Sequence, residues 1–145
     1  MRRFTQETTQ FNSRRLKVLL VDDEATMHEL MEVALKGTDY ALTSARNVDA
    51  AMKMIASLDS PDIVITDAMM PGDSGFSLIK LLKSDPTTSN IPVILWTMLI
   101  QENGAVMDSS GKADLTMSKP FDLMNILDSL TIARDMINPN LEITF

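Results

Sequence analysis

A set of side chains that can bind metal ions or phosphate groups stands where apolar runs of the sequence end. They are the carboxylates of Asp22, Asp23 and Asp67, the hydroxyl group of Thr97 and the ammonium group of Lys119, and Glu24 follows the acidic pair. Each of them alone is an ordinary residue of a turn, a helix terminus or a surface. If the fold brings them together, the carboxylates repel one another unless a cation neutralises them. A hard divalent ion with oxygen ligands, such as Mg²⁺, meets that need.

The apolar runs themselves have the composition of buried β-strands. They are short, rich in β-branched residues and bounded by turn residues. The sequence predicts strands at 17–21, 41–45, 62–66, 92–96 and 113–118. In a parallel sheet, ligand sites lie beyond the carboxyl ends of the strands, so the side chains named above are expected to converge on one crevice.

Helical patterns alternate with these strands. The sequence predicts helices at 25–36, 48–56, 74–83, 101–110 and from Asp122 onwards. Ser74 and Asp122 are suited to cap helices, Gly37 is suited to end one, and Leu30 and Leu123 are expected on buried helix faces. The alternation predicts an α/β fold, with a doubly wound, five-stranded parallel sheet and helices on both faces.

The composition excludes several other kinds of site. The chain of 145 residues has no Cys and one His, which excludes a disulfide framework and zinc sites built from thiolates and imidazoles. With 20 acidic residues against 13 basic ones, the formal charge of −7 has the wrong sign for direct binding to nucleic acid. No apolar run is long enough to span a bilayer, and residues 1–15 lack the apolar stretch that a secretory signal would need. We therefore predict no membrane insertion and a cytoplasmic location.

Four segments carry a resemblance to a known family. They are KVLLVDDE (17–24), DIVITDAMMPGDSGF (62–76), IPVILWT (91–97) and MSKPF (117–121). In residue types and in spacing they resemble the response-regulator receiver domains of the CheY-like superfamily, which act in two-component phosphotransfer. The resemblance implies a flavodoxin-like (βα)5 fold with strand order 2-1-3-4-5. We expect one receiver domain at 16–137, with a flexible tail at 1–15 and a second tail at 138–145.

The resemblance also implies a role for each chemically active side chain. Asp67 is the expected phosphoacceptor, which takes a phosphoryl group from a sensor histidine kinase or a histidine phosphotransfer protein. The expected ligands of Mg²⁺ are Asp22, Asp23, Asp67 and the backbone carbonyl of Met69. Thr97 and Lys119 are expected to bind the phosphoryl oxygens. Such a domain is a regulatory phosphoacceptor and catalyses only its own phosphorylation and dephosphorylation.

The sequence leaves three forms of output open. The leading interpretation is a stand-alone, phosphorylation-switched module that changes its binding to a downstream target protein, with homodimerisation undecided. The second is the receiver part of a longer response regulator with an effector domain. The third is a pseudo-receiver that binds partners without phosphorylation. Two departures from the family pattern keep this third form open: Thr116 replaces an aromatic switch residue, and Met98 replaces a small residue.

Three further features of the sequence have their own interpretations. GDSG at 72–75 resembles a serine-protease segment, but a turn followed by a helix cap explains it better, because the chain is too short for two β-barrels. His28 is interpreted as an exposed surface residue rather than as a phosphoryl relay. Met69 and Leu99 flank the expected approach of water to the phosphorylated aspartate, and their apolar side chains predict slow loss of phosphate.

Overall fold

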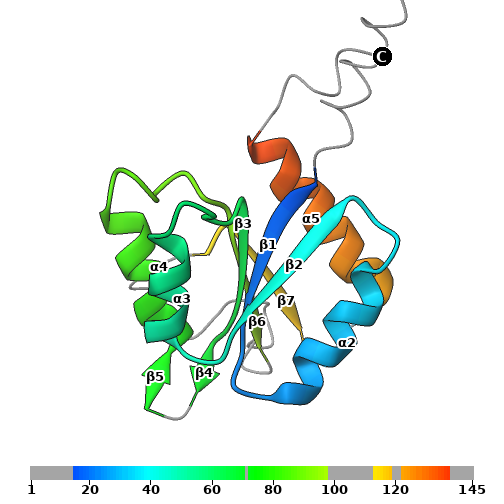
Figure 1. Ribbon diagram of the computed structural model, residues 1–145, viewed down its shortest axis with the longest axis horizontal. Helices are drawn as coiled ribbons and strands as arrows, with labels where there is room; N and C mark the ends of the chain where they lie inside the picture. The colour runs from blue at the N-terminus through cyan, green and yellow to red at the C-terminus, as the bar shows by residue number, and fades with distance from the viewer. Residues whose placement is uncertain (1–14, 71, 98–112, 119–121, 138–145) are drawn as a thin grey trace, which may run out of the picture.

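A five-stranded parallel sheet is the main element of the computed structural model, which describes residues 15–70, 72–97, 113–118 and 122–137. The order of its strands is β2-β1-β3-β6-β7 (Figure 1). The strands are β1 (Leu16–Val21), β2 (Tyr40–Ala45), β3 (Ile63–Asp67), β6 (Val93–Thr97) and β7 (Leu115–Ser118). Counted within this sheet alone, the order is 2-1-3-4-5. The predicted doubly wound, flavodoxin-like fold is therefore confirmed.

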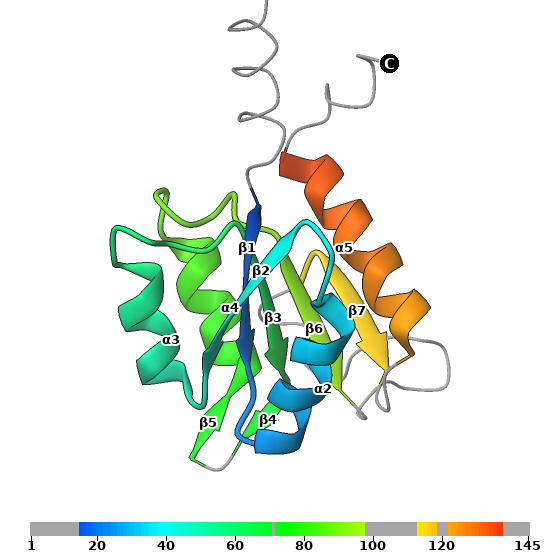
Figure 2. The same ribbon diagram turned by 45° about the vertical axis from the view of Figure 1, so that its right-hand side comes forward.

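Helices cover both faces of the sheet, as the alternating pattern predicts. They are α2 (Ala25–Leu35), α3 (Val48–Ile55), α4 (Gly75–Ser84) and α5 (Leu123–Ile137). Helices α2 and α5 pack on one face, and α3 and α4 pack on the other (Figures 1 and 2). The further helix predicted at 101–110 lies outside the described residues. None of the helices described is both long and apolar enough to cross a membrane.

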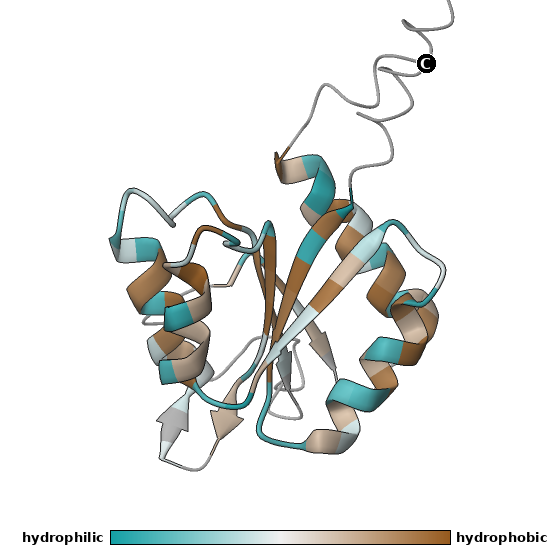
Figure 3. Ribbon diagram, viewed as in Figure 1, coloured by the Kyte–Doolittle hydropathy of each residue, from teal (hydrophilic) through white to brown (hydrophobic). Residues whose placement is uncertain are grey.

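Two apolar cores, one on each face, enclose the sheet. Successive side chains of a strand point to opposite faces, so β1 sends Val18 and Leu20 under α2 and α5. Its Leu19 and Val21 go into the other core, under α3 and α4. All four side chains are fully buried, and β1 and β3 are mainly apolar along their length (Figure 3). Burial of one such side chain contributes about 1.5–3 kcal/mol, so these cores dominate the stability of the fold.

Local signals in the sequence fix where several helices begin and end. Ser74 accepts a hydrogen bond from the backbone N–H of Phe76 (3.0 Å) and caps α4. Asp122 accepts one from the backbone N–H of Met124 (2.8 Å) at the start of α5. Gly37 follows α2 with a φ of 80°, in the left-handed region that favours glycine. The two predicted caps and the predicted helix end are confirmed.

Two leucines predicted on buried helix faces are exposed instead. Leu30 of α2 is 40% exposed, and Leu123 of α5 is 46% exposed. The buried residues of α2 are Met31 and Leu35, one helical turn apart, so the face that packs on the sheet is rotated away from Leu30. Leu123 is the first residue of α5, and the buried residues of that helix begin one turn later, at Ile126.

A short antiparallel ribbon follows β3, where the sequence predicts only a turn. It consists of β4 (Met69–Met70) and β5 (Asp73–Ser74). Gly72 lies in the turn between them with a φ of 74°. Met70 is buried and Met69 is exposed, so the ribbon turns one methionine towards the core and the other towards solvent.

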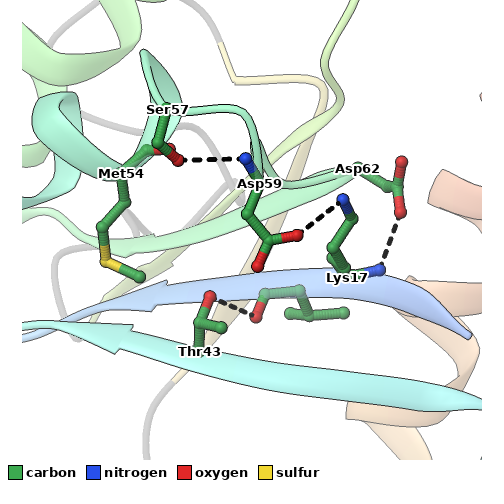
Figure 4. A network of polar contacts seen from close by, with 7 residues as sticks. Lys17, Thr43, Met54, Ser57, Asp59 and Asp62 are labelled. Carbon is green, nitrogen blue, oxygen red and sulfur yellow. Dashed lines mark hydrogen bonds and ion pairs between the residues drawn. The ribbon is translucent and has the colours of Figure 1, made fainter.

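A polar network joins the amino-terminal ends of β1 and β3, at the sheet edge opposite to the acidic residues (Figure 4). The backbone N–H of Lys17 donates to Asp62 Oδ2 (2.7 Å), and the backbone N–H of Asp62 donates to the carbonyl of Lys17 (2.8 Å). The ammonium group of Lys17 forms an ion pair with Asp59 (3.1 Å). These contacts fix the two strands relative to each other, so their carboxyl ends meet at a defined register.

Candidate functional site

The carboxyl ends of β1 and β3 bring acidic side chains together. Val21 and Thr66 are register partners on these neighbouring strands, so the residues that follow them, Asp22 and Asp67, come side by side at the sheet edge. Carboxylate oxygens of Asp22, Glu24 and Asp67 all lie within 4.8 Å of one another. Asp22 is fully buried, Asp67 is 7% exposed and Glu24 is exposed. We call these three residues the carboxylate cluster.

The chemistry of the carboxylate cluster suits a hard divalent cation. Its donor atoms are carboxylate oxygens, the ligands that Mg²⁺ and Ca²⁺ prefer. Two of its three members are buried, where repulsion between negative charges is weakly screened by water. Atoms within 4.8 Å of one another can reach a common ion. The residues of this edge therefore fit a bound divalent metal ion.

The carboxylate cluster contains Glu24, whereas the resemblance implies Asp23 as a metal ligand. Asp23 is half-buried, and its backbone carbonyl accepts hydrogen bonds from Arg46. Both acids belong to one run, and the path of the loop decides which of their carboxylates faces Asp67. The resemblance points to Asp23 as the ligand, and the sequence does not reveal that path. The role of Asp23 as a direct ligand stays a prediction.

Asp22, Asp23 and Glu24 form the loop between β1 and α2, which we call the acidic loop. It is tied to its surroundings mainly through Asp22. The backbone N–H of Asp22 donates to the carbonyl of Ala45 at the end of β2 (3.1 Å), and its Oδ1 accepts from the backbone N–H of Glu24 (2.9 Å). His28 Nε2 lies 2.6 Å from the carbonyl oxygen of Asp22. A carbonyl only accepts hydrogen bonds, so Nε2 carries the hydrogen. The prediction of His28 as an exposed surface residue is wrong, because this side chain is half-buried and holds the loop.

The backbone around Asp67 is packed against the start of α4. The hydroxyl of Thr66 donates to the carbonyl oxygen of Asp67 (3.0 Å), and the backbone N–H of Gly75 donates to the carbonyl of Ala68 (2.9 Å). A β-carbon at Gly75 would overlap the carbonyl oxygen of Asp67. Glycine alone permits this approach, so the helix start fixes the end of β3 and the backbone of Asp67.

The remaining predicted site residues follow the next two strands of the sheet. Thr97 is the last residue of β6 and follows Trp96, the register partner of Asp67. Lys119 lies outside the described residues, directly after β7, whose last residue, Ser118, is the register partner of Thr97. The order of the strands thus sets the end of β6 beside Asp67, and the end of β7 beside that of β6.

The other residues singled out on β4, β6 and β7 differ in exposure. Met69, whose backbone carbonyl is an expected metal ligand, has a side chain that is 61% exposed. Thr116, at the position where the resemblance leads us to expect a switch residue, is also exposed. Trp96 is fully buried in the core under α2 and α5. Met98 and Leu99 lie outside the described residues, so the predictions about them stay predictions.

One protein-family model matches most of the chain. The family model of the response regulator receiver domain matches residues 18–131, which run from β1 into α5. The chain belongs to the response regulator receiver domain family. Members of this family are regulatory phosphoacceptor domains of two-component systems, and they are phosphorylated on an aspartate.

Two curated relatives of this receiver domain are response regulators. Response regulator PleD of Caulobacter vibrioides is 37% identical over 106 residues, which are 73% of this chain and 23% of PleD. Phosphate regulon transcriptional regulatory protein PhoB of Pseudomonas aeruginosa is 36% identical over 104 residues, 72% of this chain and 45% of PhoB. The chain therefore spans less than half of the length of either relative.

Solved receiver domains share the fold. The signal receiver domain of a signal transduction histidine kinase from Syntrophus aciditrophicus has a TM-score of 0.75 and 29% sequence identity, with 84% of this chain and 92% of that chain covered. Chemotaxis response regulator CheY4 of Vibrio cholerae has a TM-score of 0.72, with 82% and 98% covered. At 22% identity, the second likeness bears on the fold alone.

Proposed function

We propose that this receiver domain accepts a phosphoryl group on Asp67 and that phosphorylation changes its binding to a downstream target protein. The donor is a phosphohistidine on a sensor histidine kinase or on a histidine phosphotransfer protein. One observation supports the choice of residue: Asp67 ends β3 as a nearly buried carboxylate, 7% exposed, within a cluster that also contains Asp22 and Glu24. Its oxygen is thus a nucleophile held next to a cation site.

The proposed transfer is a displacement at phosphorus. A carboxylate oxygen of Asp67 bonds to phosphorus, and the phosphorus–nitrogen bond to the donor histidine breaks. The nitrogen keeps the electron pair and takes up a proton from solvent, and the product on Asp67 is an acyl phosphate. Thr97 and Lys119 bind the phosphoryl oxygens. Beyond the nucleophile, the side chains contribute position and electrostatic stabilisation, because phosphoryl transfer asks for little other covalent work.

Mg²⁺ is the metal ion that we propose for this site. The proposed ligands are Asp22, Asp23, Asp67 and the backbone carbonyl of Met69, with Glu24 as a further candidate because it belongs to the carboxylate cluster. When bound, Mg²⁺ neutralises charge on the carboxylates and on the phosphoryl oxygens. The chain's own part is to hold several carboxylates at one sheet edge, where burial of Asp22 and Asp67 excludes most of the water.

The proposed unit is a receiver domain that switches by its own phosphorylation. We propose a receiver domain at 16–137 with tails at 1–15 and 138–145. It catalyses only its own phosphorylation and dephosphorylation, and it acts in the cytoplasm, where ATP supplies the donor kinase. Its formal charge of −7 disfavours direct contact with nucleic acid. The target is therefore a protein, and homodimerisation is one form that the change in binding can take.

Intact-mass measurement tests the proposal directly. The chain is incubated with Mg²⁺ and acetyl phosphate as a small phosphodonor, in its natural form and as Asp67→Asn and Asp62→Asn. Asp62 lies at the opposite edge of the sheet, so Asp62→Asn is a matched control for the same chemical change. We expect a mass gain of one phosphoryl group in the natural chain and in Asp62→Asn, none in Asp67→Asn, and none after EDTA removes the metal. A mass gain that persists in Asp67→Asn would overturn the assignment.

A further inference from the structure

Arg46 reaches from the end of β2 to the acidic loop. It is the first residue after β2, and its guanidinium group is exposed on the rim of the site. Both Nε and Nη2 donate to the backbone carbonyl of Asp23, at 3.3 Å and 3.2 Å. A planar guanidinium with two neighbouring N–H groups on one oxygen has a defined direction, which a flexible ammonium group does not reproduce.

The peptide unit that Arg46 contacts is held at its other side by the carboxylate cluster. The carbonyl of Asp23 and the N–H of Glu24 belong to one peptide, and this N–H donates to Asp22 Oδ1 (2.9 Å). Because the peptide bond is planar and trans, its C=O and its N–H point in opposite directions. Fixing the carbonyl of Asp23 therefore fixes the direction of the N–H that holds the carboxylate of Asp22.

The end of β2 thus holds the acidic loop at two successive points. The carbonyl of Ala45 accepts from the backbone N–H of Asp22 (3.1 Å), which continues the ladder between β1 and β2. The side chain of the next residue, Arg46, then holds the loop one residue further on, at the carbonyl of Asp23 and beyond the ladder. The ladder is backbone and does not depend on residue type, whereas the second contact depends on an arginine at this position.

We infer that Arg46 is a positioning residue of the phosphorylation site, which orients the Asp23–Glu24 peptide and, through it, the metal-binding carboxylate of Asp22. The inference rests on the proposed function, because it assigns Arg46 a role in that same metal-dependent site. Groups that orient metal ligands typically change metal affinity by about 10- to 100-fold when they are removed. Arg46 acts one peptide away from the carboxylate, so we expect the lower end of this range.

The inference predicts a hydrogen-bonding effect rather than an effect of charge. A guanidinium near carboxylates also alters the local electrostatic potential, but salt screens charges at exposed positions, with a Debye length of about 3 Å at 1 M. A hydrogen bond to a carbonyl acts at contact distance and persists in salt. An effect of Arg46 that survives about 1 M NaCl therefore belongs to positioning.

The test compares the natural chain with Arg46→Ala, Arg46→Gln, Arg46→Lys and the control Lys53→Ala. Lys53 is an exposed cation on α3 that pairs with Asp49, so its removal makes the same change in charge without touching the acidic loop. Mg²⁺ affinity and the amide signal of Glu24 are measured by ¹⁵N–¹H NMR titration, at low salt and at about 1 M NaCl. Thermal unfolding with EDTA shows that each variant is folded.

We expect the dissociation constant for Mg²⁺ to rise about tenfold in Arg46→Ala at both salt concentrations, with a shifted Glu24 amide signal before metal is added. Arg46→Lys, which keeps the charge, should restore the affinity only in part, and Lys53→Ala should match the natural chain. Natural affinity in Arg46→Ala, or a loss that disappears in high salt, would overturn the inference. If Arg46→Ala does not fold, Arg46→Gln and Arg46→Lys decide by the same criteria. A natural chain that binds no Mg²⁺ and accepts no phosphoryl group would instead refute the proposed function.

Discussion

The carbonyl oxygen of Asp67 occupies the space in which a β-carbon of residue 75 would lie, and residue 75 is a glycine. The backbone N–H of Gly75 also donates to the carbonyl of Ala68, the residue after Asp67 (2.9 Å). Helix α4 therefore begins in direct contact with the strand end that carries the proposed phosphoacceptor. The position of the nucleophile depends on the absence of a side chain eight residues further along the chain.

Gly75→Ala should separate the end of β3 from the start of α4. Forcing an extra methyl group into a filled space costs about 1–3 kcal/mol, and here the displaced atom is backbone next to Asp67. We expect a lower free energy of unfolding in urea together with a severalfold slower phosphorylation by acetyl phosphate. Gly37→Ala is the matched control, because Gly37 has a φ of 80° and open space around it, far from the site. It should lose about 1–2 kcal/mol through backbone strain and keep its phosphorylation rate. Equal rates in Gly75→Ala and Gly37→Ala would show that the contact does not position Asp67.

His28→Ala should loosen the acidic loop, because His28 holds the backbone carbonyl of Asp22. The ring nitrogen Nε2 donates to the carbonyl of Asp22 at 2.6 Å, and removing a donor from a partly buried carbonyl costs about 1–3 kcal/mol. We expect a lower melting temperature and a weaker affinity for Mg²⁺. Glu32→Ala, an exposed change one turn further along α2, serves as control and should alter neither quantity. An unchanged affinity for Mg²⁺ in His28→Ala would restrict His28 to a role in stability.

Lys83→Met should destabilise the fold without affecting the site. Its ammonium group donates to the carbonyls of Ser89 (3.1 Å) and Ile91 (2.9 Å) and to Asp114 Oδ2 (2.9 Å), and the side chain is 25% exposed. Loss of these hydrogen bonds removes the donor from the carbonyls of Ser89 and Ile91, while Asp114 Oδ2 still accepts from the backbone N–H of Val93 (2.8 Å), so we expect a decrease of about 1–3 kcal/mol in the free energy of unfolding.

The exposed pair of Lys53 and Asp49 provides the comparison for Lys83→Met. Its side chains are 78% and 82% exposed, and such helical pairs contribute only about 0.3–0.5 kcal/mol. Lys53→Met should therefore change the urea midpoint far less than Lys83→Met. Phosphorylation of both folded variants should proceed at the natural rate, because Lys83 joins the amino ends of β6 and β7. A slower phosphorylation rate in Lys83→Met alone would contradict the expectation that Lys83 stabilises the fold without affecting the site.

The architecture of this domain could be predicted from sequence because its signals are local. The apolar runs identify strands that are buried on both faces, and residues such as Ser74 and Asp122 mark helix starts with their own hydrogen bonds. The convergence at one sheet edge follows from strand direction alone. The predicted burial of Leu30 was wrong because rotation of a helix about its axis is set by packing against the sheet. The predicted burial of Leu123 was wrong because α5 begins one turn before its contact with the core.

The residues that hold the acidic loop could not be predicted in the same way. Arg46 and His28 act on backbone carbonyls, and no pattern of residue types announces a contact between a side chain and a distant peptide group. The membership of Glu24 in the carboxylate cluster has a similar origin, because it depends on the path of three consecutive acidic residues after β1. Sequence motifs therefore identified the chemistry of the site, and the path of the loop decided which side chains contact one another there.

Met69→Asn should shorten the lifetime of the phosphorylated state. Hydrolysis of an acyl phosphate needs a water molecule placed in line with the bond that breaks, and a thioether is too weak an acceptor to orient water. Met69 lies two residues after Asp67 on the ribbon and is 61% exposed, so a polar side chain at this position can replace it without disturbing the core. We expect severalfold faster loss of phosphate in Met69→Asn, measured by intact mass after the phosphodonor is removed. Met69→Leu keeps an apolar side chain and should match the natural rate. If Met69→Asn loses phosphate no faster than Met69→Leu, the methionine points into solvent without affecting the attacking water.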